Sequence, residues 1–226
     1  MACRLYLISP SAFESEAFAE NLEQALSGGD VAAFQLRIKN FPRNTDEKSV
    51  RTLFQKIKSA TKVLLPICRA KNVAFLINDY PEIAMEVGAD GVHIGNDPEL
   101  PEGFTTDLRK KNGKNFTIGV SCYDSRHLAM VAAEQGADYV SFGAFFPTKT
   151  KISPGKPKPE ILEWWSKYTT VPCTAIGGIN PENCGGLVKA GADFIAVVSY
   201  VWEHPKGPKV AVKEINSAIA KSLVNC

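Results

Sequence analysis

The sequence lacks a long apolar run, a cleavable apolar leader and any closely spaced pair of cysteines. No apolar stretch approaches the roughly 20 residues of a membrane span, so no transmembrane helix is expected. The six cysteines (Cys3, Cys68, Cys122, Cys173, Cys184 and Cys226) show no Cys-x-x-Cys spacing, which argues against a zinc site. Scattered cysteines without a leader predict a reducing compartment, the cytoplasm.

The chain also lacks a dominant charge. Its 26 basic and 24 acidic residues give a net charge of +2, and its aromatic residues are not interleaved with a basic run. This balance argues against a general nucleic-acid or membrane-surface protein. The sequence leaves the oligomeric state open, with a homo-oligomer as one alternative.

What the chain does have is a repeated Gly-Ala-Asp triplet, at Gly88–Asp90, Gly136–Asp138 and Gly191–Asp193. Each copy follows an amphipathic stretch and precedes a short run of strand-forming residues. A glycine at this place ends a helix in the left-handed conformation, and the apolar residues after it begin a buried strand. The repeat predicts a parallel α/β fold.

The hydrophobic pattern predicts eight strand–helix units. The expected strands are Arg4–Ile8, Ala32–Ile38, Ala74–Asn78, Gly91–Ile94, Phe116–Val120, Tyr139–Phe142, Cys173–Ile176 and Phe194–Ser199. The expected helices are Ser15–Leu26, Thr45–Arg69 (interrupted near Pro66), Pro81–Val87, one short helix within 97–113, Ser125–Gln135, Pro159–Lys167, Pro181–Ala190 and Lys209–Leu223. With 226 residues and no linker, this predicts a single (β/α)8 TIM-barrel domain over residues 1–226.

In such a barrel the reactive groups lie just past the carboxyl ends of the strands. The second predicted strand runs into Gln35-Leu36-Arg37-Ile38-Lys39, where alternation places Gln35, Arg37 and Lys39 on one face. An amide and two cations at a barrel mouth suit an anionic group, and arginine can bind phosphate oxygens in a bidentate manner. A solvated edge strand is the alternative, but a closed barrel has no edge.

The next three strand ends carry small polar groups. Asn78 and Asp79 could cap the following helix, or they could bind substrate and Mg²⁺. His93 is interpreted as a hydrogen-bonded wall residue rather than a base, and Asp97 as a candidate second metal ligand. Ser121 places a hydroxyl at the mouth or caps a helix, since no Ser-His-Asp pattern supports a nucleophile.

The remaining strand ends suggest an anion site. Loop 143–158 contains Thr148-Lys149-Thr150-Lys151, which forms either an oxyanion clamp or a disordered basic loop, and its length is typical of a lid or a binding loop. Gly177-Gly178 after strand seven and Val198-Ser199 after strand eight are typical of the phosphate site of these barrels, in which backbone N–H groups face the anion.

Taken in order, these motifs resemble the thiamine-phosphate synthase family. The resemblance runs from Gln35 to Ser199 and includes Gln-x-Arg-x-Lys, Asn-Asp, Gly-Ala-Asp-Gly-x-His-x-Gly, Gly-Val-Ser, Thr-x-Thr-Lys and Gly-Gly-Ile. The stretches 35–39 and 148–151 are its specific parts. It implies that a hydroxymethylpyrimidine diphosphate loses pyrophosphate and that the nitrogen of a thiazole phosphate captures the pyrimidine methylene, with Mg²⁺ as cofactor.

The resemblance also assigns roles by position. The pyrimidine diphosphate would be held by Gln35, Arg37, Lys39, Asn78 and Lys151, and Ser121 would lie near the diphosphate or the reacting centre. Of these, Arg37, Ser121 and Lys151 are the expected catalytic residues. The thiazole phosphate would contact Thr148, Thr150, Gly178, Val198 and Ser199, and the metal ligands would be Asp79 and Asp97.

One departure concerns the second metal ligand. The family places a carboxylate three residues after the glycine of strand four, where this chain has Pro98, with Asp97 one residue early. Either Asp97 serves after a small loop shift or the metal site is incomplete. A thiazole tautomerase or a catalytically impaired paralogue is therefore one alternative, and a non-catalytic phosphate-binding barrel is another. The retained residues of the diphosphate site favour the synthase.

Overall fold

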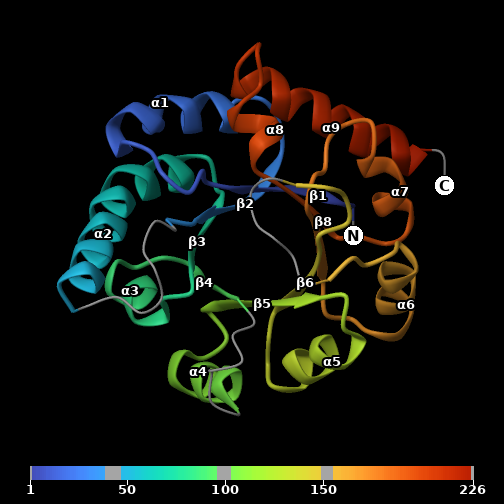
Figure 1. Cartoon of the computed structure of the whole chain (residues 1–226), viewed down its shortest axis with the longest axis horizontal. Helices are drawn as coiled ribbons and strands as arrows, with labels where there is room; N and C mark the ends of the chain where they lie inside the picture. Colours follow the sequence, from blue (N-terminus) through green and yellow to red (C-terminus); the bar gives the residue numbers. More distant parts are fainter. Residues whose placement is uncertain (1, 39–46, 96–102, 149–154, 225–226) are drawn as a thin grey trace.

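A closed barrel of eight parallel strands forms the centre of the molecule, and helices surround it (Figure 1). The computed structural model describes residues 2–38, 47–95, 103–148 and 155–224. Every strand is hydrogen-bonded to its neighbours in sequence, and β8 closes the barrel against β1. The strands are β1 (Arg4–Ile8), β2 (Val31–Leu36), β3 (Ala74–Asn78), β4 (Gly91–Ile94), β5 (Thr117–Tyr123), β6 (Tyr139–Gly143), β7 (Cys173–Ile176) and β8 (Phe194–Val197). The predicted (β/α)8 barrel is confirmed.

The helices follow the strands in the expected alternation. They are α1 (Ser15–Leu26), α2 (Glu47–Ala70), α3 (Pro81–Glu86), α4 (Phe104–Asn112), α5 (Arg126–Glu134), α6 (Glu160–Tyr168), α7 (Cys184–Lys189), α8 (Ser199–Trp202) and α9 (Pro208–Val224). Among the described residues, no helix is long and apolar enough to span a bilayer.

The Gly-Ala-Asp triplets join helices to the amino ends of strands, as predicted. Gly88, Gly136 and Gly191 have φ angles of 68°, 96° and 98°, the left-handed region that favours glycine. Each lies two residues beyond the end of the preceding helix and returns the chain toward the barrel.

The aspartate of each triplet ties two neighbouring strands together. Its carboxylate accepts the backbone N–H at or near the start of the preceding strand, at distances of 2.7 to 2.8 Å. These pairs are Asp90 with Phe75, Asp138 with Ile118, and Asp193 with Cys173. At β2 the same place is taken by Asp30, whose carboxylate binds the Arg4 guanidinium through two contacts of 2.7 Å. The repeated motif is therefore structural, and it lies at the end of the barrel opposite the predicted site.

Two layers of side chains make up the apolar interior. Between barrel and helices, large residues such as Phe34, Phe75 and Trp165 are completely buried. A smaller cluster fills the barrel itself and includes Tyr6, Leu76, Tyr139 and Ala196. Three members of this inner cluster, Tyr6, Tyr139 and Ala196, also line a cavity at the carboxyl ends of the strands.

Several predicted boundaries were wrong, including three in α2, β5 and β8. Helix α2 continues through Pro66 rather than breaking there, because Pro66 and Lys62, the residue one turn earlier, are on the exposed side of the helix, where water can bind the unpaired carbonyl. Strand β5 extends to Tyr123, with a register irregularity between Ser121 and Tyr123, so Ser121 lies within the strand.

The third boundary is at β8, which ends at Val197 instead of Ser199. The next residues form the short helix α8, whose Trp202 indole N–H donates to the Ile8 carbonyl over 2.6 Å. Val201 is completely buried. These two anchors turn the chain at Val198, and Ser199 becomes the first residue of α8.

Candidate active site

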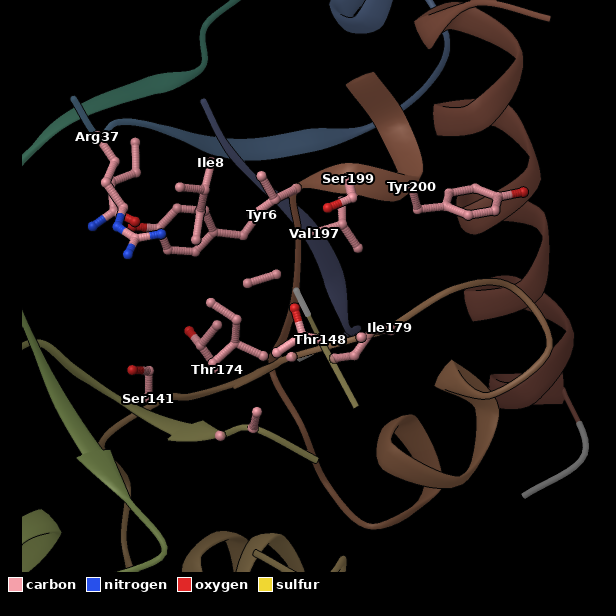
Figure 2. Close-up of a pocket in the computed structure, with 18 of the residues that line it drawn as sticks. Tyr6, Ile8, Arg37, Ser141, Thr148, Thr174, Ile179, Val197, Ser199 and Tyr200 are labelled. Atoms are coloured by element: carbon pink, nitrogen blue, oxygen red, sulfur yellow. The ribbon is translucent and has the colours of Figure 1, made fainter. Parts of the chain in front are cut away.

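A cavity of about 590 Å³ opens at the carboxyl ends of the strands, and residues from all eight strands or the loops after them line it. Figure 2 shows Arg37 on one side of this cavity and Ser199 and Thr148 on the other, with Tyr6 between them. The cavity is therefore long enough to place two groups of polar residues on opposite walls.

The wall formed by β2 and β3 carries a chain of amide and carboxylate hydrogen bonds. The Gln35 amide donates to Asn78 Oδ1 over 3.0 Å, and Asn78 Nδ2 donates to Asp79 over 2.5 Å. The other Asp79 oxygen accepts the Gly95 backbone N–H over 2.8 Å. Gln35 and Asn78 are buried yet line the cavity, so their remaining polar atoms can face a ligand. Since α3 begins after Tyr80 without a side-chain cap, the capping alternative for Asn78 and Asp79 was wrong.

Arg37 follows β2 and brings a positive charge into this wall. Its backbone N–H donates to Ser9 Oγ over 2.9 Å, which fixes the residue at the cavity mouth. Burial lowers the pKa of the Arg37 guanidinium, and the nearby Asp79 carboxylate raises that pKa in part. Among the described residues, no carboxylate forms an ion pair with Arg37. A partly buried cation with only distant compensation favours binding of an anion.

The opposite wall is built where the chain after β6 crosses the end of β7. The Phe145 N–H donates to Ile176 and the Phe146 N–H to Gly177, each over 3.1 Å. A Cβ atom on Gly178 would lie 2.4 Å from the Pro147 carbonyl oxygen, and Gly178 has a φ of 61°. Only glycine fits such a crossing, and Thr148 is thereby brought to the same cavity as Gly178.

Val198 and Ser199 complete this wall from β8. Both residues line the cavity, and the Trp202 anchor of α8 holds them at its rim. The structure thus brings Thr148, Gly178, Val198 and Ser199 together, as the sequence predicted.

A third set of polar side chains lines the cavity and is joined by hydrogen bonds. His93 Nε2 lies 2.9 Å from Ser121 Oγ, and His93 Nδ1 lies 2.9 Å from the Tyr139 hydroxyl. The Tyr139 hydroxyl lies 2.8 Å from that of Tyr6. The interpretation of His93 as a hydrogen-bonded wall residue is confirmed. Ser121 caps no helix, because Ser125 accepts the Leu128 N–H at the start of α5.

The sequence analysis missed Tyr6 and Tyr139. Each lies in a predicted strand. By strand alternation, the side chain of each tyrosine points to the same face as the residue two or four positions later, at the end of that strand. A tyrosine on the inner face of a closed barrel needs a hydrogen-bond partner, and that requirement was the available signal.

Four predicted site residues, Lys39, Asp97, Thr150 and Lys151, lie outside the described residues. Within the described ranges, no group of three or more histidine, cysteine, aspartate or glutamate side chains could hold a metal ion. Asp79 is a carboxylate of the described wall. The second predicted metal ligand, Asp97, belongs to segment 96–102, outside the described residues.

Fold and site together define a class. This is a (β/α)8-barrel protein with an arginine and amide wall facing a glycine-and-hydroxyl wall across one cavity, the arrangement of an enzyme that binds phosphorylated compounds.

Comparison with known proteins identifies the family within this class. The family model described as "Thiamine monophosphate synthase" matches residues 5–201. A protein of Rhodospirillum centenum named "Thiamine-phosphate synthase" is 50% identical over 214 residues, covering 95% of this chain and 96% of that protein. One of the same name from Erythrobacter litoralis is 45% identical, covering 96% of this chain and 95% of its own length.

A solved structure agrees with these matches. The thiamine phosphate pyrophosphorylase from Pyrococcus furiosus superposes with a TM-score of 0.74 at 30% identity, covering 97% of this chain and 96% of that one. The chain belongs to the thiamine-phosphate synthase family, whose enzymes act in thiamine biosynthesis.

Proposed function

We propose that this chain, acting as one barrel domain in the cytoplasm, joins hydroxymethylpyrimidine diphosphate to a thiazole phosphate and releases pyrophosphate. The product is thiamine phosphate. The names of the relatives support the synthase over the tautomerase and over a non-catalytic barrel. The five described cysteines are buried free thiols, in keeping with a reducing compartment.

The observation that carries this proposal is the pair of facing walls. A reaction between a diphosphate and a monophosphate requires two anion sites that share one cavity. Arg37, Gln35 and Asn78 on the first wall suit the diphosphate, and Thr148, Gly178 and Ser199 on the second suit the single phosphate. The space between the walls is where the two rings would meet.

On the first wall, the hydrogen-bond chain supports orientation of the pyrimidine substrate. The Gln35 amide is held by Asn78, so its orientation is set before the substrate arrives. Arg37 would balance the negative charge that grows on the departing diphosphate. An electron-rich aminopyrimidine can stabilise the cation left behind, so charge neutralisation and positioning matter more than a strong base. Lys39 and Lys151 are proposed to add positive charge around the same group.

Asp79 is suited to hold Mg²⁺. Its two oxygens accept hydrogen bonds from Gly95 and Asn78, and a carboxylate is the kind of oxygen ligand that Mg²⁺ prefers. Mg²⁺ commonly uses one or two protein carboxylates and keeps several waters, so Asp97 could act through a water despite its shifted position. Bound there, the ion would neutralise part of the diphosphate charge.

On the second wall, backbone N–H groups at the glycine pair and the hydroxyls of Thr148 and Ser199 are proposed to hold the thiazole phosphate. With that phosphate fixed, the thiazole ring would extend toward the pyrimidine methylene. Apolar residues of the inner cluster, including Ile8 and Ala196, also line the cavity, and they would limit the water that can quench the cation.

Incubation of the purified protein with both phosphorylated substrates, with and without Mg²⁺, tests the proposal. We expect thiamine phosphate and pyrophosphate in equal amounts, and only with the metal. Conversion of a thiazole carboxylate phosphate to its isomer without joining would favour the tautomerase. Binding of thiazole phosphate without any product would favour the non-catalytic barrel.

A further inference from the structure

A chain of four side chains crosses the barrel interior from β1 to β5. It links Tyr6, Tyr139, His93 and Ser121 through three contacts of 2.8 to 2.9 Å. The His93 and Tyr139 rings are stacked, with centroids 5.6 Å apart. The chain begins at the buried inner cluster, which contains Tyr6, and ends at Ser121 on the cavity lining.

The packing leaves little freedom in the middle of this chain. A Cβ atom on Gly119 of β5 would lie 2.0 Å from the Tyr139 ring, so the ring passes directly over that glycine. Tyr139 pairs in register with Gly119 across β5 and β6. The glycine thus makes room for the ring and holds its hydroxyl between Tyr6 and His93.

Counting donors and acceptors gives the chain a direction. Burial raises the pKa of both tyrosine hydroxyls, so each carries its proton at neutral pH. Among the described residues, Tyr139 is the one hydrogen-bond partner of the Tyr6 hydroxyl. If Tyr139 donated to Tyr6, the Tyr6 O–H would be a buried donor with no acceptor, which is costly.

The favoured direction therefore runs outward. Tyr6 donates to Tyr139, and Tyr139 donates to His93 Nδ1, which must then be unprotonated. His93 carries its proton on Nε2 and donates it to Ser121 Oγ. The hydroxyl proton of Ser121 remains for a partner in the cavity.

This direction argues against Ser121 as a nucleophile with His93 as its base. Its separation of 2.9 Å is typical of a nucleophile and its base. A base must offer a free nitrogen to the serine, but Nε2 already bears a proton. In addition, the group on Nδ1 is a tyrosine hydroxyl and not the carboxylate that stabilises an imidazolium in a catalytic triad.

We propose that Tyr139, backed by Tyr6, is a positioning residue that fixes His93 as the Nε2–H tautomer and so makes Ser121 a hydrogen-bond donor to an anionic oxygen of the departing diphosphate. The identity of that anion rests on the proposed function. Such a donor strengthens as negative charge develops on the leaving group, and it is in place before the substrate binds.

The first test is independent of substrate. The protein contains three histidines, so nitrogen NMR of histidine-labelled protein, assigned with His93→Gln, can show which His93 nitrogen carries the proton. We expect Nε2–H as a single neutral tautomer at neutral pH. A proton on Nδ1, alone or together with one on Nε2, would overturn the proposal.

The second test is a double-mutant cycle on binding of inorganic pyrophosphate with Mg²⁺, measured by calorimetry for Ser121→Ala, Tyr139→Phe and the double variant. Ser121→Ala should weaken binding about tenfold or more, as expected for a hydrogen bond to a charged group. Tyr139→Phe keeps the ring and should weaken binding about threefold or more, but by a much smaller factor when Ser121 is already alanine. Tyr168→Phe, an exposed tyrosine on α6, is the matched control and should bind as the wild type does.

The outcomes separate this proposal from the proposed function. Equal factors for Tyr139→Phe in both backgrounds would show that Tyr139 does not act through Ser121 and would overturn the inference alone. Failure of the wild type to bind pyrophosphate with Mg²⁺ would instead count against the diphosphate site. The histidine tautomer would still decide whether the chain has the direction argued here.

Discussion

Arg37→Ala should lower turnover far more than it lowers stability. In the structure the Arg37 side chain reaches the cavity and forms no ion pair with a described residue, while burial lowers the pKa of the guanidinium. Its positive charge therefore contributes little to folding. Loss of a charge-assisted bond to the leaving group should cost about 2–4 kcal/mol in the transition state, which corresponds to roughly 30- to 900-fold in rate.

The assay measures kcat and KM for the pyrimidine diphosphate at saturating Mg²⁺, together with thermal unfolding. We expect kcat to fall by that factor and the free energy of unfolding to change by no more than about 1 kcal/mol. Arg37→Lys should recover part of the rate, because a lysine keeps the charge but not the bidentate geometry. Arg51→Ala removes an exposed arginine from α2 and should leave both quantities unchanged.

Two results would refute this reasoning. An unchanged rate would show that Arg37 does not face the diphosphate. A fall in rate matched by a large loss of stability would show that Arg37 supports the fold, contrary to its lack of a described ionic partner.

Asp79→Asn should raise the Mg²⁺ concentration needed for half-maximal activity, while Asp97→Ala should raise it less; wild-type behaviour of the Asp79 variant in a Mg²⁺ titration would remove Asp79 as a ligand. Gly178→Ala should raise KM for the thiazole phosphate by about tenfold or more and leave KM for the pyrimidine diphosphate unaffected, because the added methyl meets a carbonyl oxygen at 2.4 Å. Gly186→Ala is its control, since a Cβ there meets nothing within 4 Å, and equal KM values for the two variants would contradict the steric argument. In a Cys226→Ser protein at pH 8, a thiol reagent should label the native state no faster than it unfolds, because burial raises the pKa of four thiols to about 12 and thiolate forms only as pH approaches that value; fast labelling of the folded protein would disprove this.

The barrel could be predicted because its signals are local. A left-handed glycine followed by a short apolar run marks the amino end of a strand, and three such places fixed the alternation of helix and strand. The errors occurred where distant contacts override local preference. The turn after Val197 depends on Trp202 reaching the Ile8 carbonyl, which is 194 residues away in the sequence.

The site could be predicted in part for the same reason. Strand alternation correctly placed Gln35 and Arg37 on one wall, because that rule needs only neighbouring residues. The Tyr6–Tyr139 contact joins residues 133 positions apart, and no local pattern predicts it. The hydrogen bonds of Asp79 and Ser121 likewise depend on residues distant in the sequence, Gly95 directly after β4 and His93 within β4.

The aspartates at the amino ends of β2, β4, β6 and β8 have a consequence for how the barrel opens. Each one fastens an even-numbered strand to the odd-numbered strand before it, through Asp30, Asp90, Asp138 or Asp193. Two of these aspartates also bind the next strand through their backbone carbonyls: Asp90 accepts the Thr117 N–H of β5 and Asp193 accepts the Arg4 N–H of β1, each over 2.9 Å. The amino end of the barrel should therefore open as one cooperative unit, with β4 joined to both β3 and β5, and β8 joined to both β7 and β1. The two walls of the cavity lie at the other ends of these same strands, so both would depend on that single unit.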